Sequence, residues 1–408
     1  MKQVSFPEIP HQEFQERRAK AKKFMAEAEM DAMLLLCIEN IYYYTGFRKT
    51  WPFHWLHAAV FPLDGDPALI VPQISHKIAE KTSYAKEVRP FGGDPAVVRL
   101  PQDAVELVLD AMRDMGLSKK TIGLELNGPA MYTAIFPAQF DEIRSGLPKA
   151  KFVNCTDLIW KMRMVKTSWE TEAVRKACEI TMKGFKAGLE TVREGVSELE
   201  VLKAIYAVFI AEGAVDTPLE AMMCIRGGVK DYDMSTSRPV DRKLTRGRQL
   251  FFDGGACYKG YRIDVQREAC IGEPSQLERK LVEWSMKGQE AGEKAFQPGI
   301  KVSEVHKATM SVLGRVPLDL RAMGVEHAVY HTFMGHGEGL AIHEPPWITG
   351  TEDTVLEPGM VLSLEAGALD IPKHRELGFY PEDLYLITKV GCENLTGNLL
   401  PRELWVVK

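Results

Sequence analysis

Gly247–Arg267 reads GRQLFFDGGACYKGYRIDVQR, and this stretch decides the fold of the second half of the chain. Two aspartates, Asp253 and Asp264, each end an apolar run and lie eleven residues apart. The segment GGACYKG between them indicates a turn, and two strands joined by a tight turn can bring their carboxylates onto one face of a sheet. Two buried acids repel each other unless a cation lies between them. The stretch therefore predicts a metal ion bound through oxygen.

The composition is that of an ordinary globular protein, with 408 residues, 45% of them hydrophobic and 26% charged. A net charge of -5 gives no large basic surface, which argues against nucleic acid as a partner. No apolar run reaches the roughly 18 residues of a membrane span, and the N-terminus lacks the apolar core of a signal peptide. The seven cysteines are dispersed, which favours reduced thiols. We therefore expect a cytoplasmic protein without a membrane partner.

The first 160 residues alternate strand-like runs with helical patterns. The strand-like runs are NIYYYTGF (40–47), ALIVP (68–72) and TIGLEL (121–126). A helical pattern is present in DAVELVLDAMRDMG. This alternation predicts an α/β domain with a mixed sheet over residues 1–160, so that a second domain covers 161–408. Thr167-x-x-Glu170 predicts a capping box that opens a long helix.

The second domain contains an internal repeat. EITMKGFKAGLETVREG (179–195) and EWSMKGQEAGEKAFQPG (283–299) are identical at seven of seventeen positions. GRQLFFDGGA (247–256) is repeated as GMVLSLEAGA (359–368), in the same order along the chain. Two repeats in the same order favour duplication of one unit over chance. A duplicated unit folds as two halves around a pseudo-two-fold axis.

The repeat makes Asp253 and Glu365 equivalent, because each lies six residues after a glycine and is followed by x-Gly-Ala. In the second copy Glu382, in the strand-like run GFYPEDLYLIT, is the partner of Glu365. Equivalent acids converge near a pseudo-two-fold axis, so four carboxylates should face one another there. They could not all ionise without cations.

A histidine in a glycine-rich turn completes the cluster. Gly335 and Gly337 flank His336 in HTFMGHGEGLAIHEPP, which lets the backbone bend close to a ligand, and His343 follows seven residues later. Imidazole together with carboxylates suits manganese, iron, cobalt or zinc. One histidine among four carboxylates argues against a structural zinc site.

The five residues Asp253, Asp264, His336, Glu365 and Glu382, in this order and these local contexts, resemble the metal ligands of the creatinase, prolidase, aminopeptidase P and methionine aminopeptidase superfamily (M24). The resemblance covers nearly the whole chain. It implies a small N-terminal creatinase-like α/β domain and a C-terminal "pita-bread" domain. It also implies two divalent metal ions per subunit, manganese foremost with cobalt, iron or zinc as alternatives, and hydrolysis of an amide-type C–N bond.

The resemblance also implies individual roles. Asp264 and Glu382 would bridge the two metals, Asp253 would complete one metal's shell, and His336 and Glu365 would complete the other's. Two such metals lower the pKa of a bridging water and polarise the scissile carbonyl. Glu365 would carry the proton from the water to the leaving nitrogen.

The expected substrate side of the site departs from the peptidases. His343 would hydrogen-bond the substrate or the oxyanion. Thr236, however, stands where a histidine is usual, Tyr380 where Xaa-Pro peptidases have arginine, and Glu338 where an aliphatic residue is usual. These three positions are candidate substrate contacts.

Three functions follow from this comparison. The first is an Xaa-Pro dipeptidase or aminopeptidase acting on a short peptide or small amide. The alternative is a small-molecule hydrolase or lyase of the same fold, similar to ectoine hydrolase, creatinase or dimethylsulfoniopropionate lyase. A binding protein without catalysis is disfavoured, because such proteins usually lose metal ligands and this chain retains all five.

One N-terminal stretch, GFRKTWPFHWLH (46–57), adds a further candidate. In creatinase-like dimers the corresponding loop reaches into the other subunit's site. Arg48, Trp51, His54 and Trp55 would supply a cationic and aromatic wall for a small anionic or zwitterionic substrate, while dimer packing is the alternative. We therefore expect a homodimer with the N-terminal domain near the other subunit's active site.

Overall fold

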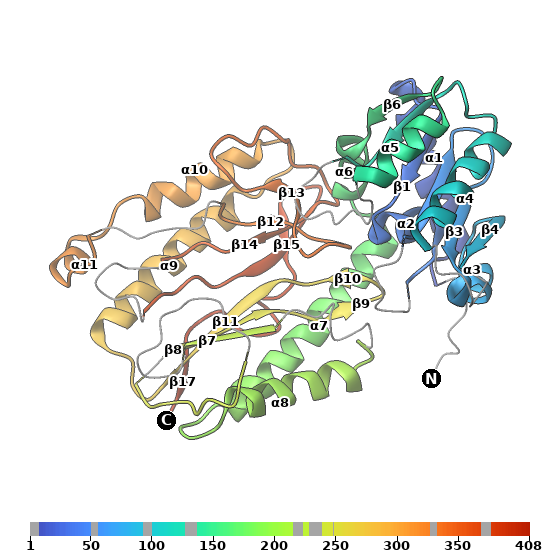
Figure 1. Cartoon of the computed structure of the whole chain (residues 1–408). Coiled ribbons are helices and arrows are strands. Elements are labelled where there is room, and N and C mark those ends of the chain that lie inside the picture. The colour runs from blue at the N-terminus through green and yellow to red at the C-terminus, as the bar shows by residue number, and fades with distance from the viewer. Residues whose placement is uncertain are drawn as a thin grey trace. The chain divides into compact units, whose positions relative to one another are not determined.

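The computed structural model describes residues 8–49, 56–92, 100–126, 137–214, 223–227, 239–247, 249–326, 333–368 and 377–408 (Figure 1). The chain divides into two units, Met1–Arg163 and Met164–Lys408, and each is described by itself. Among the helices in these ranges, none has both the length and the apolar character needed to cross a membrane.

A six-stranded sheet forms the N-terminal unit, in the order β4-β3-β2-β1-β5-β6. Its strands are β1 (Ala32–Leu35), β2 (Ala58–Pro62), β3 (Ala68–Pro72), β4 (Glu87–Phe91), β5 (Thr121–Leu124) and β6 (Lys151–Asn154). The helices are α1 (His11–Glu27), α2 (Ile38–Thr45), α3 (His76–Thr82), α4 (Leu100–Asp114), α5 (Pro137–Gly146) and α6 (Thr156–Met164), with a short 3-10 turn, η1 (Gln73–Ser75). Because β1 pairs antiparallel with β2 and parallel with β5, the sheet is mixed, as predicted.

The prediction of a strand over NIYYYTGF is wrong, because these residues form most of helix α2 and its end. Three consecutive tyrosines favour a strand by propensity. Gly46, however, adopts a left-handed conformation (φ 79°) and donates its N–H to Tyr42 O, which ends a helix. All residues from Asn40 to Thr45 are buried, so no polar face reveals the helical period.

A buried carboxylate, Glu125, connects several elements of the N-terminal unit. One of its oxygens accepts the backbone N–H groups of Leu36 (2.5 Å) and Cys37 (2.7 Å), and the other accepts the Asn40 amide (2.6 Å). Asn40 in turn accepts a hydrogen bond from Arg163 at 2.7 Å. Burial raises the pKa of Glu125 to about 7, and the donors and Arg163 offset only part of that effect.

This carboxyl makes the free energy of unfolding depend on pH. An unfolded chain releases the Glu125 proton near 4.5, whereas the folded chain keeps it to about 7. The folded state therefore binds more protons in this window, and we expect stability to fall by up to about 3 kcal/mol as pH rises through it. Glu125→Gln should remove this contribution in equilibrium denaturation of the full chain. The exposed Glu142→Gln serves as control, and a wild-type slope in Glu125→Gln would contradict the prediction.

The C-terminal unit contains two matching halves. The first has helices α7 (Ser168–Thr191) and α8 (Glu198–Ala211) and a sheet of order β17-β11-β8-β7, with β7 (Met223–Gly227), β8 (Gln249–Gly254), β11 (Val265–Ile271) and β17 (Trp405–Val407). The second has α9 (Gln276–Ala295), α10 (Val302–Leu313) and α11 (Leu318–Ala322) and a sheet of order β13-β12-β14-β15-β16, with β12 (His336–Gly337), β13 (Glu344–Trp347), β14 (Val361–Leu364), β15 (Asp383–Ile387) and β16 (Cys392–Asn394). The strands lie between the α7–α8 pair and the α9–α10 pair (Figure 1).

The repeated glycines have the same structural role in both halves. A Cβ on Gly184 of α7 would lie 2.3 Å from Phe209 of α8, and one on Gly288 of α9 would lie 2.4 Å from Leu313 of α10. Both glycines therefore permit close packing of two helices. The predicted internal repeat is confirmed, and the capping box is present, with Thr167 accepting the N–H of Glu170.

The connection between β8 and β11 is more elaborate than the predicted turn. It contains a small hairpin of its own, formed by β9 (Cys257–Tyr258) and β10 (Tyr261–Arg262). Lys259 (φ 52°) and Gly260 (φ 82°) form its tip. β8 and β11 still pair antiparallel, with Asp253 opposite Gln266.

Candidate metal centre

Each half delivers two carboxylates in the same way. Asp253 lies near the end of β8, and Asp264 immediately precedes β11, its antiparallel partner. Glu365 immediately follows β14, and Glu382 immediately precedes β15, again its antiparallel partner. Gln266 and Glu382 form an isolated backbone bridge between the two sheets. The four acids are thereby brought to the junction of the two halves.

Possible ligand atoms gather at this junction. Nε2 of His336 lies 3.6 Å from an oxygen of Glu382 and 4.0 Å from an oxygen of Glu365. Within each of three overlapping groups, the ligand atoms lie within 4.8 Å of one another, and the groups are Asp253–Asp264–Glu382, His336–Glu365–Glu382 and Asp264–His336–His343. Asp264, His336 and Glu382 each belong to two groups. The structure thus brings together all five residues of the predicted ligand set, together with His343.

The chemistry of these atoms fits divalent cations. In the part of the chain that the structure describes, Oδ1 of Asp264 and Oε1 of Glu382 are buried without a hydrogen-bond partner. Burial, and then the neighbouring carboxylates of Asp264 and Glu365, raise the pKa of Glu382 well above its usual range. Buried, mutually repelling oxygens of this kind are satisfied by hard or borderline cations.

A hydrogen bond to the backbone orients the ring of His336. Nδ1 of His336 donates to the carbonyl oxygen of Gly337 at 3.1 Å, so that Nε2 faces the carboxylates. Burial lowers the pKa of His336 to about 4, which keeps the ring neutral and able to ligate. Gly335 has φ of 142°, and a Cβ there would lie 2.2 Å from the carbonyl oxygen of Ser363. Glycine is therefore required at this position.

His343 lies beside the ligand groups and is less enclosed. Its Nε2 lies 3.2 Å from Oδ2 of Asp264, and its ring centroid lies 4.2 Å from that of His336. Its side chain is 35% exposed, against 1% for His336. His343 can therefore meet both a ligand carboxylate and a molecule that enters from solvent.

Two of the candidate substrate contacts lie inside the same unit. Glu338 is fully buried, and one of its oxygens accepts the backbone N–H of Asp264 at 3.1 Å. Tyr380 is 3% exposed, its ring lies 5.3 Å from Phe251, and its N–H donates to Glu268 at 2.9 Å. Both side chains thus contact the protein interior.

Of the remaining candidates, one lies within the described residues. Arg48 belongs to the N-terminal unit, where it pairs with Glu8 at 3.3 Å and lies over the Tyr42 ring at 5.5 Å. The other four are outside the described residues, and they are Trp51, His54, Trp55 and Thr236.

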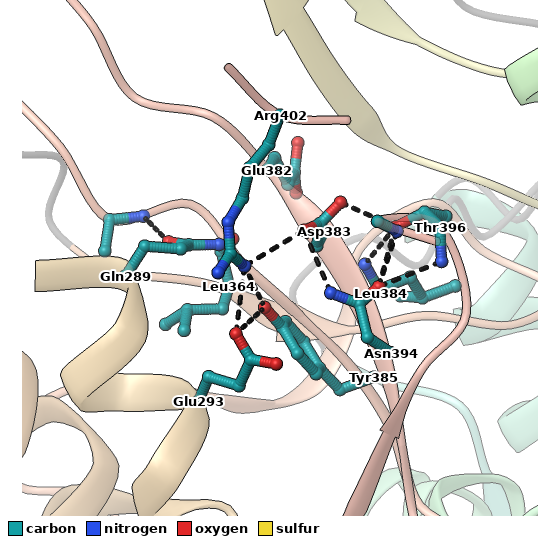
Figure 2. Close-up of polar contacts among 12 residues, drawn as sticks. Gln289, Glu293, Leu364, Glu382, Asp383, Leu384, Tyr385, Asn394, Thr396 and Arg402 are labelled. Carbon is teal, nitrogen blue, oxygen red and sulfur yellow. Dashed lines mark hydrogen bonds and ion pairs between the residues drawn. The ribbon is translucent and has the colours of Figure 1, made fainter. Parts of the chain in front are cut away.

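Sequence reasoning missed a buried ion pair next to the ligands. Arg267 of β11 donates to Asp383 of β15 at 2.6 Å, and both side chains are almost completely enclosed. Three further side chains donate to Asp383, and they are Thr396 (2.8 Å), Asn394 (3.0 Å) and Arg402 (3.2 Å) (Figure 2). The available signal was the charge itself, because Arg267 interrupts a strand in which every residue is buried.

Comparisons with known proteins cover both units. Residues 172–389, more than half of the chain, match the model of metallopeptidase family M24, and residues 17–165 match the creatinase/prolidase N-terminal domain. The chain is 29% identical over 382 residues to an Xaa-Pro dipeptidase of Pyrococcus furiosus, covering 93% of this chain and 97% of that protein.

Solved structures share the fold. The crystal structure of recombinant prolidase from Thermococcus sibiricus has a TM-score of 0.79 at 24% identity, covering 97% of this chain and 99% of that chain. The dipeptidase PepE from Mycobacterium ulcerans has a TM-score of 0.75 at 25% identity, covering 97% of this chain and 98% of that chain. Both likenesses extend over the N-terminal and the C-terminal unit.

Proposed function

The chain belongs to metallopeptidase family M24 and is a metallohydrolase, and we propose that it uses two divalent metal ions to hydrolyse Xaa-Pro dipeptides. The observation that carries the proposal is the set of three overlapping ligand groups, in which Asp264 and Glu382 are shared. Shared carboxylates are what two neighbouring ions require.

The proposed ligand assignment follows the groups. Asp264 and Glu382 would bridge the ions, Asp253 would complete one shell, and His336 and Glu365 the other. Manganese is the foremost candidate, with cobalt, iron or zinc as alternatives, because mixed oxygen and imidazole shells accept all of them. When bound, the ions would supply a nucleophilic water at neutral pH and Lewis acidity toward the scissile carbonyl.

Two residues would move protons or stabilise charge. The Glu365 side chain is 11% exposed and the most accessible of the acids in its ligand group, which supports its role in taking a proton from the attacking water and giving it to the leaving nitrogen. His343 would donate a hydrogen bond to the oxyanion of the tetrahedral intermediate, and its 35% exposed side chain supports this role. Asp264, which lies beside Nε2 of His343, would hold that ring in position.

A second candidate function is favoured by Tyr380. In this chain the position carries an aromatic ring that packs against Phe251. The backbone N–H of Tyr380 donates to the buried Glu268. The side chain at this position therefore offers a substrate carboxylate no positive charge, unlike an arginine. This supports a small-molecule hydrolase or lyase of the same fold, similar to ectoine hydrolase, creatinase or dimethylsulfoniopropionate lyase, as the alternative.

We also propose that the protein is a homodimer located in the cytoplasm. The creatinase-like N-terminal domain supports a homodimer in which the segment around Arg48 lies near the other subunit's active site. The proposal places this dimer in the cytoplasm.

One assay tests both metal dependence and substrate class. The protein is stripped with a chelator, reloaded with manganese or cobalt, and offered Xaa-Pro dipeptides, matched Xaa-Ala dipeptides, creatine, ectoine and dimethylsulfoniopropionate. We expect the stripped protein to be inactive and the reloaded protein to prefer Xaa-Pro. Full activity after exhaustive metal removal would contradict a metallohydrolase mechanism. Turnover of only the small non-peptides would establish the second candidate.

A further inference from the structure

The first bridging candidate, Asp264, is held by a residue of the opposite half. Glu338 follows β12, and its backbone N–H donates to Val361 of β14 at 3.2 Å, so it belongs to the second sheet. Oε2 of Glu338 accepts the N–H of Asp264 in the first half at 3.1 Å. Glu338 has 0% exposure, so its side chain is enclosed by the protein. The Glu338 side chain therefore affects the site through its hydrogen bond with the N–H of Asp264.

A neighbouring backbone contact strengthens this crossing. The N–H of Arg262 donates to the carbonyl oxygen of Gly339 at 2.8 Å, so the segment before Asp264 runs against the segment after Glu338. The remaining oxygen of Glu338, Oε1, is buried and has no hydrogen-bond partner within the described ranges. A buried acceptor left without a partner is costly. Among the described residues, the hydrogen bond to the N–H of Asp264 is thus the one that the Glu338 carboxyl makes, and it lies beside the ligand groups.

The second bridging candidate, Glu382, belongs to the second half and is held by a residue of the first half. Nη1 of Arg267, in the first half, donates to the backbone carbonyl of Glu382 in the second half at 2.7 Å. Nη2 donates to the adjacent Asp383 at 2.6 Å, and Arg267 is 1% exposed. A planar guanidinium that binds a carbonyl and a carboxylate together fixes both position and direction.

The backbone bridge between Gln266 and Glu382 is by itself a weak connection between the two halves. The two hydrogen bonds between Gln266 and Glu382 are both 3.4 Å long, which is longer than the roughly 2.7–3.2 Å typical of N–H···O bonds. The contacts of Glu338 and Arg267 are shorter, at 3.1 Å and 2.7 Å, and the one made by Arg267 comes from a charged guanidinium.

We propose that Glu338 and Arg267 form a reciprocal clamp, in which each half of the unit holds the backbone of the other half's bridging residue, Asp264 or Glu382, and thereby sets the metal affinity of the site. Neither residue touches the reacting atoms, so both are positioning residues. The inference rests on the proposed metal centre. Outer partners of metal ligands commonly change metal affinity by about 10–100-fold when they are replaced.

Two substitutions at one position test the clamp. Glu338→Gln keeps an oxygen that can accept the Asp264 N–H, whereas Glu338→Leu removes the acceptor at similar volume. Metal-free protein is titrated with manganese by calorimetry, and the visible absorption of cobalt-loaded protein reports ligand geometry. We expect Glu338→Leu to bind manganese about 10–100-fold more weakly and to change the cobalt spectrum. Glu338→Gln should retain most of the affinity.

Glu198 provides a matched control. It is also fully buried and accepts a backbone N–H, that of Val240 at 2.9 Å, and it pairs with Arg242 at 2.8 Å, but it belongs to none of the ligand groups. Glu198→Leu should lower thermal stability and leave manganese affinity unchanged. Its comparison with Glu338→Leu separates the loss of a buried hydrogen bond from the loss of the clamp.

Each outcome decides between distinct claims. A wild-type protein that binds no divalent metal would refute the proposed metal centre itself. A wild-type protein that binds metal, together with a Glu338→Leu variant that binds it equally well, would overturn the clamp alone, as would equal losses in Glu338→Gln and Glu338→Leu. If circular dichroism shows Glu338→Leu to be unfolded, Arg267→Lys is titrated instead. An unchanged affinity in that variant would likewise overturn the clamp.

Discussion

Replacing Asp264 with asparagine should remove metal from the protein and abolish hydrolysis of every substrate. Asp264 belongs to two of the three ligand groups, and its Oδ1 has no hydrogen-bond partner among the described residues. Asparagine has nearly the same shape but is neutral, and one of its two terminal atoms cannot ligate a cation. We expect kcat/KM to fall by at least about 1,000-fold, equivalent to about 4 kcal/mol of transition-state stabilisation.

Metal analysis and thermal unfolding separate this effect from misfolding. Asp264→Asn should carry little metal after purification in manganese. Its metal-free form should be at least as thermostable as metal-free wild type, because one of several repelling carboxylates has become neutral. The exposed Asp353→Asn, whose partner is Lys301, should keep wild-type metal content and activity. An Asp264→Asn protein with wild-type metal content would show that Asp264 is not a ligand.

The internal repeat made most of the fold predictable. Equivalent acids at the ends of equivalent apolar runs predicted two halves, and the helix pairs and the β8–β11 and β14–β15 pairings confirm them. The mixed α/β N-terminal unit, the family and the enzyme class are also confirmed. These features could be predicted because each depends on a pattern of residues that are close together in the sequence, such as an apolar run, a turn or a repeated motif.

Features that depend on contacts between distant residues were not predictable. Arg267 and Asp383 lie far apart in the sequence, and the local sequence around either residue does not predict that the two form an ion pair. The sequence predicts Glu338 as a substrate contact because it stands where the related peptidases usually have an aliphatic residue. Its side chain points to the N–H of Asp264, and that direction follows from how β12 crosses the β10–β11 connection. Helix α2 was missed because burial on all sides hides its period.

The largest effect on stability should come from Arg267→Met. The substitution leaves Asp383 at 0% exposure without its 2.6 Å partner. Breaking a buried ion pair by removing one member typically costs about 3–5 kcal/mol, because the remaining charge stays desolvated. Thr396, Asn394 and Arg402 still donate to Asp383, so we expect a loss within that range and retention of the fold under mild conditions. Chemical denaturation of the metal-free protein measures it.

The double variant Arg267→Met/Asp383→Leu shows whether the buried charge is the cause. Replacing both members of a buried pair with apolar residues is often close to neutral, so the double variant should be more stable than Arg267→Met alone. Arg402 would then lack one of its acceptors but still contact Glu293 at 3.0 Å and the Tyr385 hydroxyl at 3.0 Å (Figure 2). If Arg267→Met matched wild type, the other donors to Asp383 would suffice. The guanidinium would then act through its bonds to backbone carbonyls, which are those of Glu382, Gln266 and Leu400, and metal affinity would still report the bond to Glu382.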